Sequence, residues 1–341
     1  MNGAQLRTTA LGFLGTFAIL GLLLYFVGVE EVVRELRKAD PRIAVFIVVA
    51  ALGWLAAWGF GLRTVLHVLG AELSFAKSFL VLNGAMFSNN VTPFGQAGGE
   101  PVTALLISKV ADTEYERGLA AIASVDSLNF VPSIVLSLAG AGFYATQTPF
   151  SRQLRIATGA IVALSIAVPI LGFFGWRNRA RVRRTVAKIL APILKRVTRF
   201  VPADIALSRQ KIDARIREFF DSIERVATNR KGLALTLGAS TAGWVFQMVA
   251  LWLAFAAIGS AVPFSVLLFV VPVGAIAGVT PLPGGAGGIE AVLVGLLSSL
   301  PAAGVEWQTA FTAVVLFRAA IYWVPVVIGG GVVSIVGVDS V

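Results

Sequence analysis

Four ionisable residues interrupt long apolar stretches of the sequence, and they are the first candidates for chemistry. They are Glu100, Asp126, Glu290 and Arg318. An ionisable side chain inside a membrane is costly, so each should face the protein interior and find a partner. A carboxylate there suits a proton or an amine, whereas the fork of Arg318 matches phosphate oxygens. We expect Arg318 to pair with Asp126 or with a glutamate, and a purely structural ion pair remains the alternative.

A duplicated broken motif surrounds both glutamates. Residues 91–100 read VTPFGQAGGE and residues 279–290 read VTPLPGGAGGIE. Proline cannot continue a helix, and glycine permits positive φ and close backbone approach. Each motif therefore predicts a helix that stops and then restarts, near Glu100-Pro101 and near 287–290. Proline is favoured at the first helical position, and an acid in the first turn complements the helix dipole.

Bare backbone groups at such a break are tolerated at membrane depth only when protein or a wet cavity surrounds them. Paired broken helices in two halves of a transporter point to its substrate site. The alternative is that the glycines only permit tight packing and that each glutamate only caps a half-helix. The residues that we predict to line the site are Glu100, Asp126, Glu290, Arg318, Asn90, Thr92, Gln96, Gly98, Gly99, Thr280, Gly284, Gly285, Gly287, Gly288 and Tyr322.

The composition is that of an integral membrane protein. Of the 341 residues 57% are hydrophobic and 13% are charged, against about 25% charged in soluble domains. The chain has no cysteine and one histidine, His67, which excludes thiolate chemistry and a histidine-based metal cluster. No nucleophile–base pair, phosphate-binding loop or metal spacing is present, so we expect neither an enzyme nor a cofactor. The net charge of +10 favours anionic lipid over nucleic acid as the partner.

The apolar blocks predict the elements that position these residues. Six blocks are long enough to span a core of about 30 Å: 10–28, 43–69, 116–146, 153–176, 231–258 and 305–336. We interpret 10–28 as a retained span and not as a cleaved signal peptide. The shorter blocks 75–92, 101–110, 264–280 and 287–300 suit two re-entrant hairpins, 75–110 and 264–301. The predicted fold is all-α, with six transmembrane helices and two re-entrant hairpins in an inverted repeat.

Basic residues predict the orientation. Nine of them and no acid lie between Arg177 and Arg199, which places this loop in the cytoplasm. Both termini then lie inside, in a multi-pass protein of the cell membrane. We expect one membrane domain over 1–341, with repeat A in 1–176 and a basic linker in 177–230. Repeat B would combine 153–176 with 231–341.

Three segments between the spans have apolar residues at helical spacing, as in helices that lie in the membrane interface. They contain Val29, Val32, Val33 and Leu36; Val182, Val186, Ile189, Ile193 and Val197; and Ile212, Ile216, Phe219, Ile223 and Val226. A soluble helical cap on the cytoplasmic face is the alternative. The basic stretch 177–199 is predicted to contact anionic phospholipid.

The sequence resembles the flippase-like membrane region of the lysylphosphatidylglycerol synthases. The resemblance rests on Pro93 to Glu100, on PLPGGAGGIE at 281–290 and on RAAIYWVP at 318–325, and it covers nearly the whole chain. The family usually has an arginine in the span after the first hairpin, where this sequence reads SVDSLN at 124–129. The resemblance implies a stand-alone member, without the synthase domain, that moves an aminoacylated or polyprenyl-phosphate lipid between leaflets.

A lipid flippase is therefore our leading hypothesis, with the headgroup between the hairpins and the tails in the bilayer. Arg318 would hold phosphate, and Glu100, Asp126 and Glu290 would bind amine or proton. An ion-coupled transporter of a small polar solute is the first alternative. A membrane-embedded lipid-modifying enzyme or an accessory subunit is the second, and a homo-oligomer stays open.

Overall fold

The computed structural model is helical throughout the part of the chain that it describes. That part comprises residues 39–92, 96–145, 209–279 and 282–336, with isolated positions at 34, 37 and between 159 and 178. Its elements are α3 (Pro41–Val68), α4 (Phe75–Val91), α5 (Gln96–Ala111), α6 (Tyr115–Ala145), α9 (Arg209–Thr228), α10 (Arg230–Ala257), α11 (Phe264–Ile276), the short 3₁₀ turns η2 (Ala277–Val279) and η3 (Pro283–Gly285), α12 (Gly288–Ser299) and α13 (Trp307–Val336). No strand occurs in these ranges, as the all-α prediction requires.

Helices long and apolar enough to cross a membrane match four of the predicted spans. Within the described residues they cover Pro41–Val68, Tyr115–Phe143, Arg230–Ala257 and Trp307–Ile335. These bounds agree with the predicted spans 43–69, 116–146, 231–258 and 305–336 to within a few residues. The predicted spans 10–28 and 153–176 lie outside the described residues, apart from isolated positions.

Local caps determine where the long helices begin. Pro41 takes the first position of α3, and the Asp40 carboxylate accepts a hydrogen bond of 2.8 Å from the Arg42 backbone N–H. Ser74 and Asn229 cap α4 and α10 in the same way. Such side chains satisfy N–H groups that a helix start leaves without a partner.

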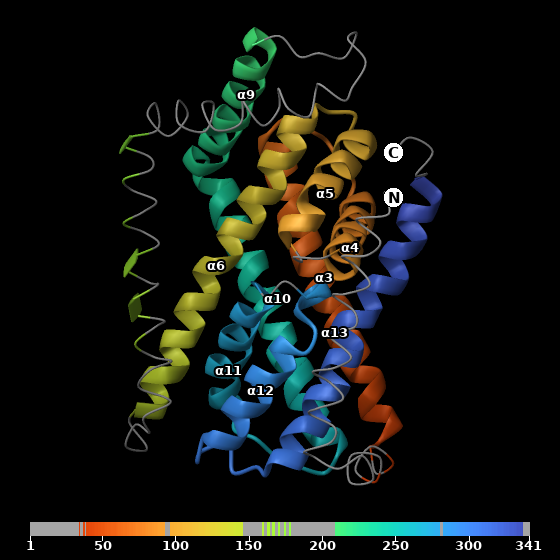
Figure 1. Cartoon of the computed structure of the whole chain (residues 1–341), viewed down its shortest axis with the longest axis vertical. Helices are drawn as coiled ribbons and strands as arrows, with labels where there is room; N and C mark the ends of the chain where they lie inside the picture. The colour runs from red at the N-terminus through yellow and green to blue at the C-terminus, as the bar shows by residue number, and fades with distance from the viewer. Residues whose placement is uncertain are drawn as a thin grey trace.

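Two helical hairpins run into the molecule from opposite ends (Figure 1). α4 runs inward from the upper end and α5 returns to it, whereas α11 runs inward from the lower end and α12 returns there. The inner ends of α4 and α5, and those of α11 and α12, lie near the middle of the structure. The breaks therefore bring the two copies of the sequence motif toward the same level of the molecule.

The described helices form two halves, α3 to α6 and α10 to α13, which pack on each other reciprocally. The first helices of the two halves, α3 and α10, lie along each other in the most extensive helix–helix contact of the described part. The last helix of each half packs on the hairpin of the other half, α13 on α4 and α6 on α11. This reciprocal packing agrees with an inverted repeat. The proposed bounds of repeats A and B include segments outside the described residues and stay a prediction.

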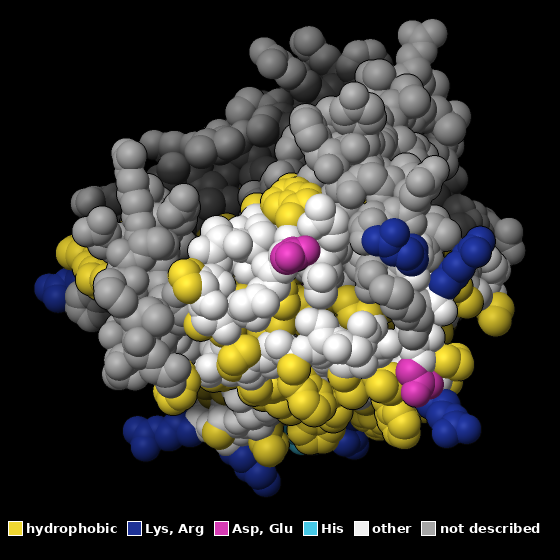
Figure 2. Space-filling model, turned by 90° about the horizontal axis from the view of Figure 1, so that it is seen from below, with side chains coloured by type: hydrophobic (Ala, Val, Ile, Leu, Met, Phe, Trp, Pro, Cys, Tyr) yellow, Lys and Arg dark blue, Asp and Glu magenta, His cyan; other side chains and the backbone are white. Residues whose placement is uncertain are grey.

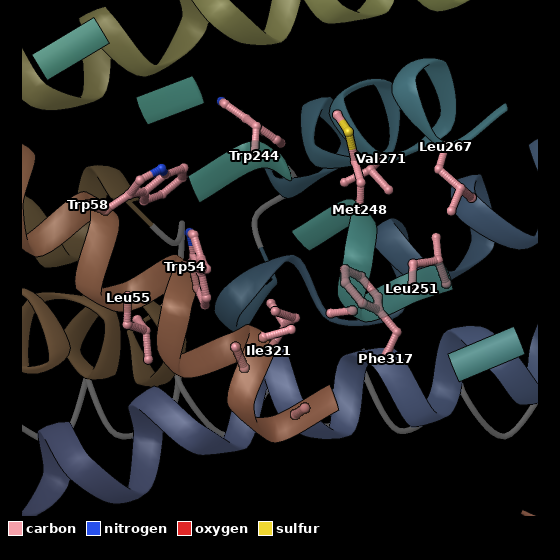
Figure 3. Packing of buried hydrophobic residues seen from close by; sticks show 14 of the residues in the cluster. Trp54, Leu55, Trp58, Trp244, Met248, Leu251, Leu267, Val271, Phe317 and Ile321 are labelled. Atoms are coloured by element: carbon pink, nitrogen blue, oxygen red, sulfur yellow. The ribbon is translucent and has the colours of Figure 1, made fainter. Parts of the chain in front are cut away.

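An aromatic cluster marks the crossing of α3, α10 and α6 (Figure 3). The ring centroids of Trp54 and Trp58 lie 5.4 Å apart, and those of Trp58 and Trp244 lie 5.9 Å apart, both edge to face. Such pairs stabilise a core beyond the area that they bury. The Trp244 indole N–H donates to the Asn129 carbonyl of α6 at 3.0 Å. This hydrogen bond joins the core to α6 at Asn129, three residues after Asp126.

The amphipathic helix α9 packs on the upper ends of α6 and α10. Of the predicted apolar face, Ile216 and Val226 are buried and Phe219 and Ile223 are partly buried, while the side chain of Ile212 is not among those described. Glu218 accepts a hydrogen bond of 2.8 Å from Nε of Arg117 on α6, and this bond lowers the pKa of Glu218. The other two amphipathic segments, around Val29–Leu36 and Val182–Val197, lie outside the described residues.

The sequence prediction for the first break was wrong in one respect. α5 begins at Gln96 and not near Glu100, so Pro101 lies inside the helix and Glu100 is not in its first turn. A helix can continue through proline in a membrane protein because neighbouring groups satisfy the freed carbonyl. The second break is as predicted, because α12 begins at Gly288 with Glu290 in its first turn.

Seen from below, the described surface shows yellow hydrophobic side chains among white backbone and polar atoms, with Lys and Arg side chains mostly toward its margins (Figure 2). Large apolar side chains are also exposed along the flanks, for example Val45, Val135 and Val327. Exposed apolar surface of this extent needs a membrane or a partner to cover it.

Candidate functional site

The second break is a tight glycine turn that ends in a capped helix. Gly284, Gly285 and Gly287 have φ of +57°, +64° and +84°, a region that only glycine adopts at low cost. Glu290 Oε2 accepts a hydrogen bond of 2.6 Å from the Gly287 N–H. The carboxylate therefore caps α12, and the turn and cap together hold Glu290 in a fixed direction.

Glu290 and Arg318 form a buried ion pair. Nε of Arg318 donates to Oε1 of Glu290 at 2.7 Å, and Nη2 donates to the Gly284 carbonyl at 3.2 Å. The two residues are only 6% and 9% exposed, so their interaction is little screened by solvent. The prediction of a glutamate–Arg318 pair is confirmed, and Arg318 does not pair with Asp126. The pair neutralises both charges within the second half.

The two hairpins meet through Asn90, Tyr322 and Gly284. The Tyr322 hydroxyl donates to the Asn90 carbonyl at 3.0 Å, and Nδ2 of Asn90 donates to the Tyr322 carbonyl at 3.4 Å. A Cβ added to Gly284 would lie 2.7 Å from Oδ1 of Asn90 and 2.7 Å from Cε2 of Tyr322. The guanidinium of Arg318 lies 5.6 Å from the centre of the Tyr322 ring. The end of α4 is thus fixed against the second break and against α13.

Among the described residues, the carboxylates near the first break have no cationic partner. Glu100 on α5 is half-buried, and it acts electrostatically on Asp126 of α6. Oδ2 of Asp126 is buried and has no hydrogen-bond donor among the described residues. Oδ1 of Asn89, which lies against the Gly99 backbone, is also buried without a donor.

The two halves therefore differ in charge at corresponding places. The second half holds an acid and a base, Glu290 and Arg318, whose charges cancel. The first half holds two acids, Glu100 and Asp126, whose charges repel. Two carboxylates near each other and away from water repel unless a proton or a cation joins them. In the second half Arg318 is that cation, whereas no described side chain takes this role in the first half.

The remaining predicted site residues lie in several different places. Gly285 and Gly288 lie beside Gly284 and Gly287 in the second break, and Gly99 lies at the α4–α5 contact. Thr92 directly follows α4 as its C-cap residue, and its hydroxyl donates to the Ser88 carbonyl at 2.6 Å. Gln96 and Gly98 belong to α5 and not to a loop, and Thr280 lies outside the described residues.

Sequence reasoning missed two contacts of asparagines. Asn89 is not among the residues predicted to line the site, yet its buried side-chain oxygen lies against the α5 backbone at Gly99. Asn129 serves through its carbonyl, which accepts the Trp244 indole N–H. The run SVDSLN at 124–129, polar within an apolar span, was a signal for Asp126, whereas the contact of Asn129 uses a backbone group and does not depend on its side chain. The described residues contain no group of three or more metal-ligating side chains.

Known proteins are similar to this chain over nearly its whole length. The family model described as the lysylphosphatidylglycerol synthase TM region matches residues 9–329. A UPF0104 membrane protein of Methanothermobacter thermautotrophicus is 28% identical over 330 residues, which are 95% of this chain and 92% of that protein. A UPF0104 membrane protein of Pyrococcus horikoshii is 26% identical over 91% of each chain. Another, from Methanocaldococcus jannaschii, is 23% identical over 95% of this chain and 93% of its own length.

Proposed function

Because the chain belongs to the lysylphosphatidylglycerol synthase transmembrane-region family, we propose that this membrane protein moves a polar-headed lipid between leaflets. The lipid would be an aminoacylated phospholipid or a polyprenyl-phosphate-linked lipid. Its headgroup would pass the breaks of the two hairpins while its tails stay in the bilayer. The chain would act as a translocase and not as an enzyme.

One observation supports this proposal above the others: two broken hairpins run in from opposite ends and meet at Asn90, Gly284 and Tyr322. Irregular backbone at membrane depth belongs where it lines a substrate path. Reciprocal halves also supply a means of access, since one half can open to one side while the other half closes.

The proposed topology has six spans and two re-entrant hairpins in the cell membrane. The end that carries α9 would face the cytoplasm, because basic loops stay inside. Exposed Arg225, Arg230 and Lys231 lie near that end, and the basic stretch 177–199 would add to them. Both termini would then be cytoplasmic, and anionic phospholipid would contact this surface.

An ion-coupled transporter of a small polar solute is the second candidate. The acid pair Glu100–Asp126 favours it, because such pairs often serve proton or cation coupling in transporters. The two candidates differ in cargo and not in architecture. A lipid cargo needs a lateral route for its tails, whereas a solute needs a path closed to the bilayer.

Leaflet exchange in proteoliposomes tests the proposal. The purified full chain is reconstituted with fluorescent lipids of amine-bearing, anionic and polyprenyl-phosphate headgroups. A membrane-impermeant quencher then reports the fraction that reaches the outer leaflet. We expect faster exchange than in protein-free vesicles, with Asp126→Asn slower and the exposed control Asp221→Asn unchanged.

Three results would count against the proposal. Folded protein that exchanges none of these lipids faster than empty vesicles would overturn it. Uptake of a radiolabelled polar solute without lipid exchange would favour the transporter. A modified lipid detected by mass spectrometry after incubation would instead establish an enzyme.

A further inference from the structure

We infer that Glu100, Asp126 and Asn89 form a binding site for a singly charged cationic group. The group is either the ammonium of a lipid headgroup or a free monovalent cation. The lipid source rests on the proposed function, whereas the free-cation source does not. The site lies on both sides of α5, which carries Glu100 and packs against α4 and α6.

In the second half of the chain, the glutamate that corresponds to Glu100 binds a cationic group. Glu290, near the start of α12, holds the guanidinium of Arg318 at 2.7 Å. Arg318 is thus a tethered cation supplied by the following long helix. In the first half the following long helix supplies Asp126, an acid, at a similar place after Glu100. The first half therefore has the carboxylate without the tethered cation, and an exchangeable cation can take that role.

Unpartnered oxygens provide an independent argument. Oδ2 of Asp126 and Oδ1 of Asn89 are both buried and lack a hydrogen-bond donor among the described residues. Asn89 is only 9% exposed, and its oxygen lies against the backbone of Gly99, the residue before Glu100 in the sequence. A buried acceptor without a donor costs free energy. A ligand that brings donors or positive charge removes this cost.

The number and type of these oxygens indicate the ligand. Glu100, Asp126 and Asn89 offer acceptors of two acids and one amide, and an ammonium group has three N–H donors. Calcium takes six to eight oxygens, and magnesium needs near-octahedral geometry. The acceptors described here are too few for either without many waters. Glu100 is half-buried, which leaves a route for exchange.

Lipid binding and cation stabilisation test the two sources. Native mass spectrometry of the full chain with phosphatidylethanolamine and its N-acetylated form measures headgroup preference. Unfolding temperature in sodium, potassium or choline chloride at equal ionic strength measures free-cation binding. Both measurements are made on the wild type, Glu100→Gln, Asp126→Asn and the control Asp221→Asn. The amide variants keep the side-chain size, and circular dichroism checks that they are folded.

We expect one of two patterns. If the source is lipid, the wild type and Asp221→Asn prefer the free amine about tenfold, as one charge-assisted hydrogen bond would give, and both amide variants lose this preference. If the source is a free cation, sodium or potassium raises the unfolding temperature of the wild type and of Asp221→Asn but not of the amide variants. The inference is overturned if folded wild type shows neither effect, or if the amide variants retain the effect.

Failure of this inference and failure of the proposed function are distinguishable. Lipid exchange that persists without amine preference or cation stabilisation would refute the cation site alone. Cation stabilisation without any lipid exchange would refute the translocase and keep the site.

Discussion

The Tyr322 hydroxyl donates a hydrogen bond of 3.0 Å to the Asn90 carbonyl, although 232 positions separate the two residues in the sequence. Asn90 lies in the last turn of α4, the arm of the first hairpin that runs inward. Tyr322 lies one turn after Arg318 on α13. The same tyrosine ring lies against Gly284 and near the Arg318 guanidinium. Tyr322 therefore connects both hairpins with the buried ion pair.

Replacing Tyr322 with phenylalanine should loosen this connection without disturbing the core. The change removes one hydrogen bond, whose net contribution is about 0.5–1.5 kcal/mol. We expect faster hydrogen exchange at the end of α4 and in η3, measured by mass spectrometry. Exchange in α3 and α10 should stay unchanged, and equal acceleration everywhere would contradict a local role.

Replacing Gly284 with alanine should be clearly destabilising. The residue has φ of +57°, and a Cβ would approach Asn90 and Tyr322 to 2.7 Å. Strain of this kind costs on the order of 1–3 kcal/mol. The matched control is Gly295→Ala in α12, where a Cβ meets nothing within 4 Å and alanine favours the helix by up to about 1 kcal/mol. Thermal unfolding in detergent should separate the two, and equal midpoints would contradict the tight turn.

Breaking the Glu290–Arg318 pair should be costly on either side. A buried charge left without its partner destabilises a protein by about 3–5 kcal/mol. We expect Glu290→Gln and Arg318→Met each to lower the unfolding temperature strongly. The double variant should be more stable than the sum of the single effects predicts, because no unpaired charge remains. Additive losses in this cycle would show that the two side chains do not interact.

The packing of α9 on α6 should become weaker at acid pH. The hydrogen bond from Arg117 lowers the pKa of Glu218 from its ordinary value near 4.5. The ion pair therefore stabilises docking above about pH 4.5, and this stabilisation is lost as pH falls through the lowered folded-state pKa. Hydrogen exchange across 216–226 should be slower in the wild type than in Glu218→Gln near neutral pH. The two should converge in acid, and a difference independent of pH would contradict the assignment.

Much of the fold could be predicted from hydrophobic block lengths. Spans such as Pro41–Val68 and Arg230–Ala257 are apolar over a bilayer thickness, and proline and glycine mark where the hairpins break. The start of α5 was harder to predict, because Gly98, Gly99 and Pro101 weaken a helix locally whereas packing against α4 and α6 stabilises it. Local propensity alone would have placed Gln96 outside the helix.

Sequence reasoning singled out the four charged residues, and it left the partner of Arg318 open between Asp126 and a glutamate. Glu100, Asp126, Glu290 and Arg318 stood out because a charge inside an apolar block is costly. Sequence spacing left open which acid Arg318 would meet, since that depends on how α12 and α13 pack. The buried oxygen of Asn89 could not be predicted, because asparagine in a helix usually finds a donor or solvent.

A reversible cross-link between the hairpins tests the central claim most directly. The chain has no cysteine, so Asn90→Cys with Gly284→Cys introduces a single pair. Cγ of Asn90, whose place the sulfur of a cysteine would take, lies 3.2 Å from a Cβ built on Gly284, so the two sulfurs can come within bonding distance. Cysteine at 284 meets the same backbone strain as alanine there, so circular dichroism first checks that Gly284→Cys and the double variant are folded.

Lipid exchange of this double variant is then measured in proteoliposomes before and after reduction, with each single variant as a control. If the hairpins must separate to pass a headgroup, exchange is lost on oxidation and returns on reduction, while the single variants do not respond. Unchanged exchange with the cross-link fully formed would contradict the claim that lipid moves between the two hairpins.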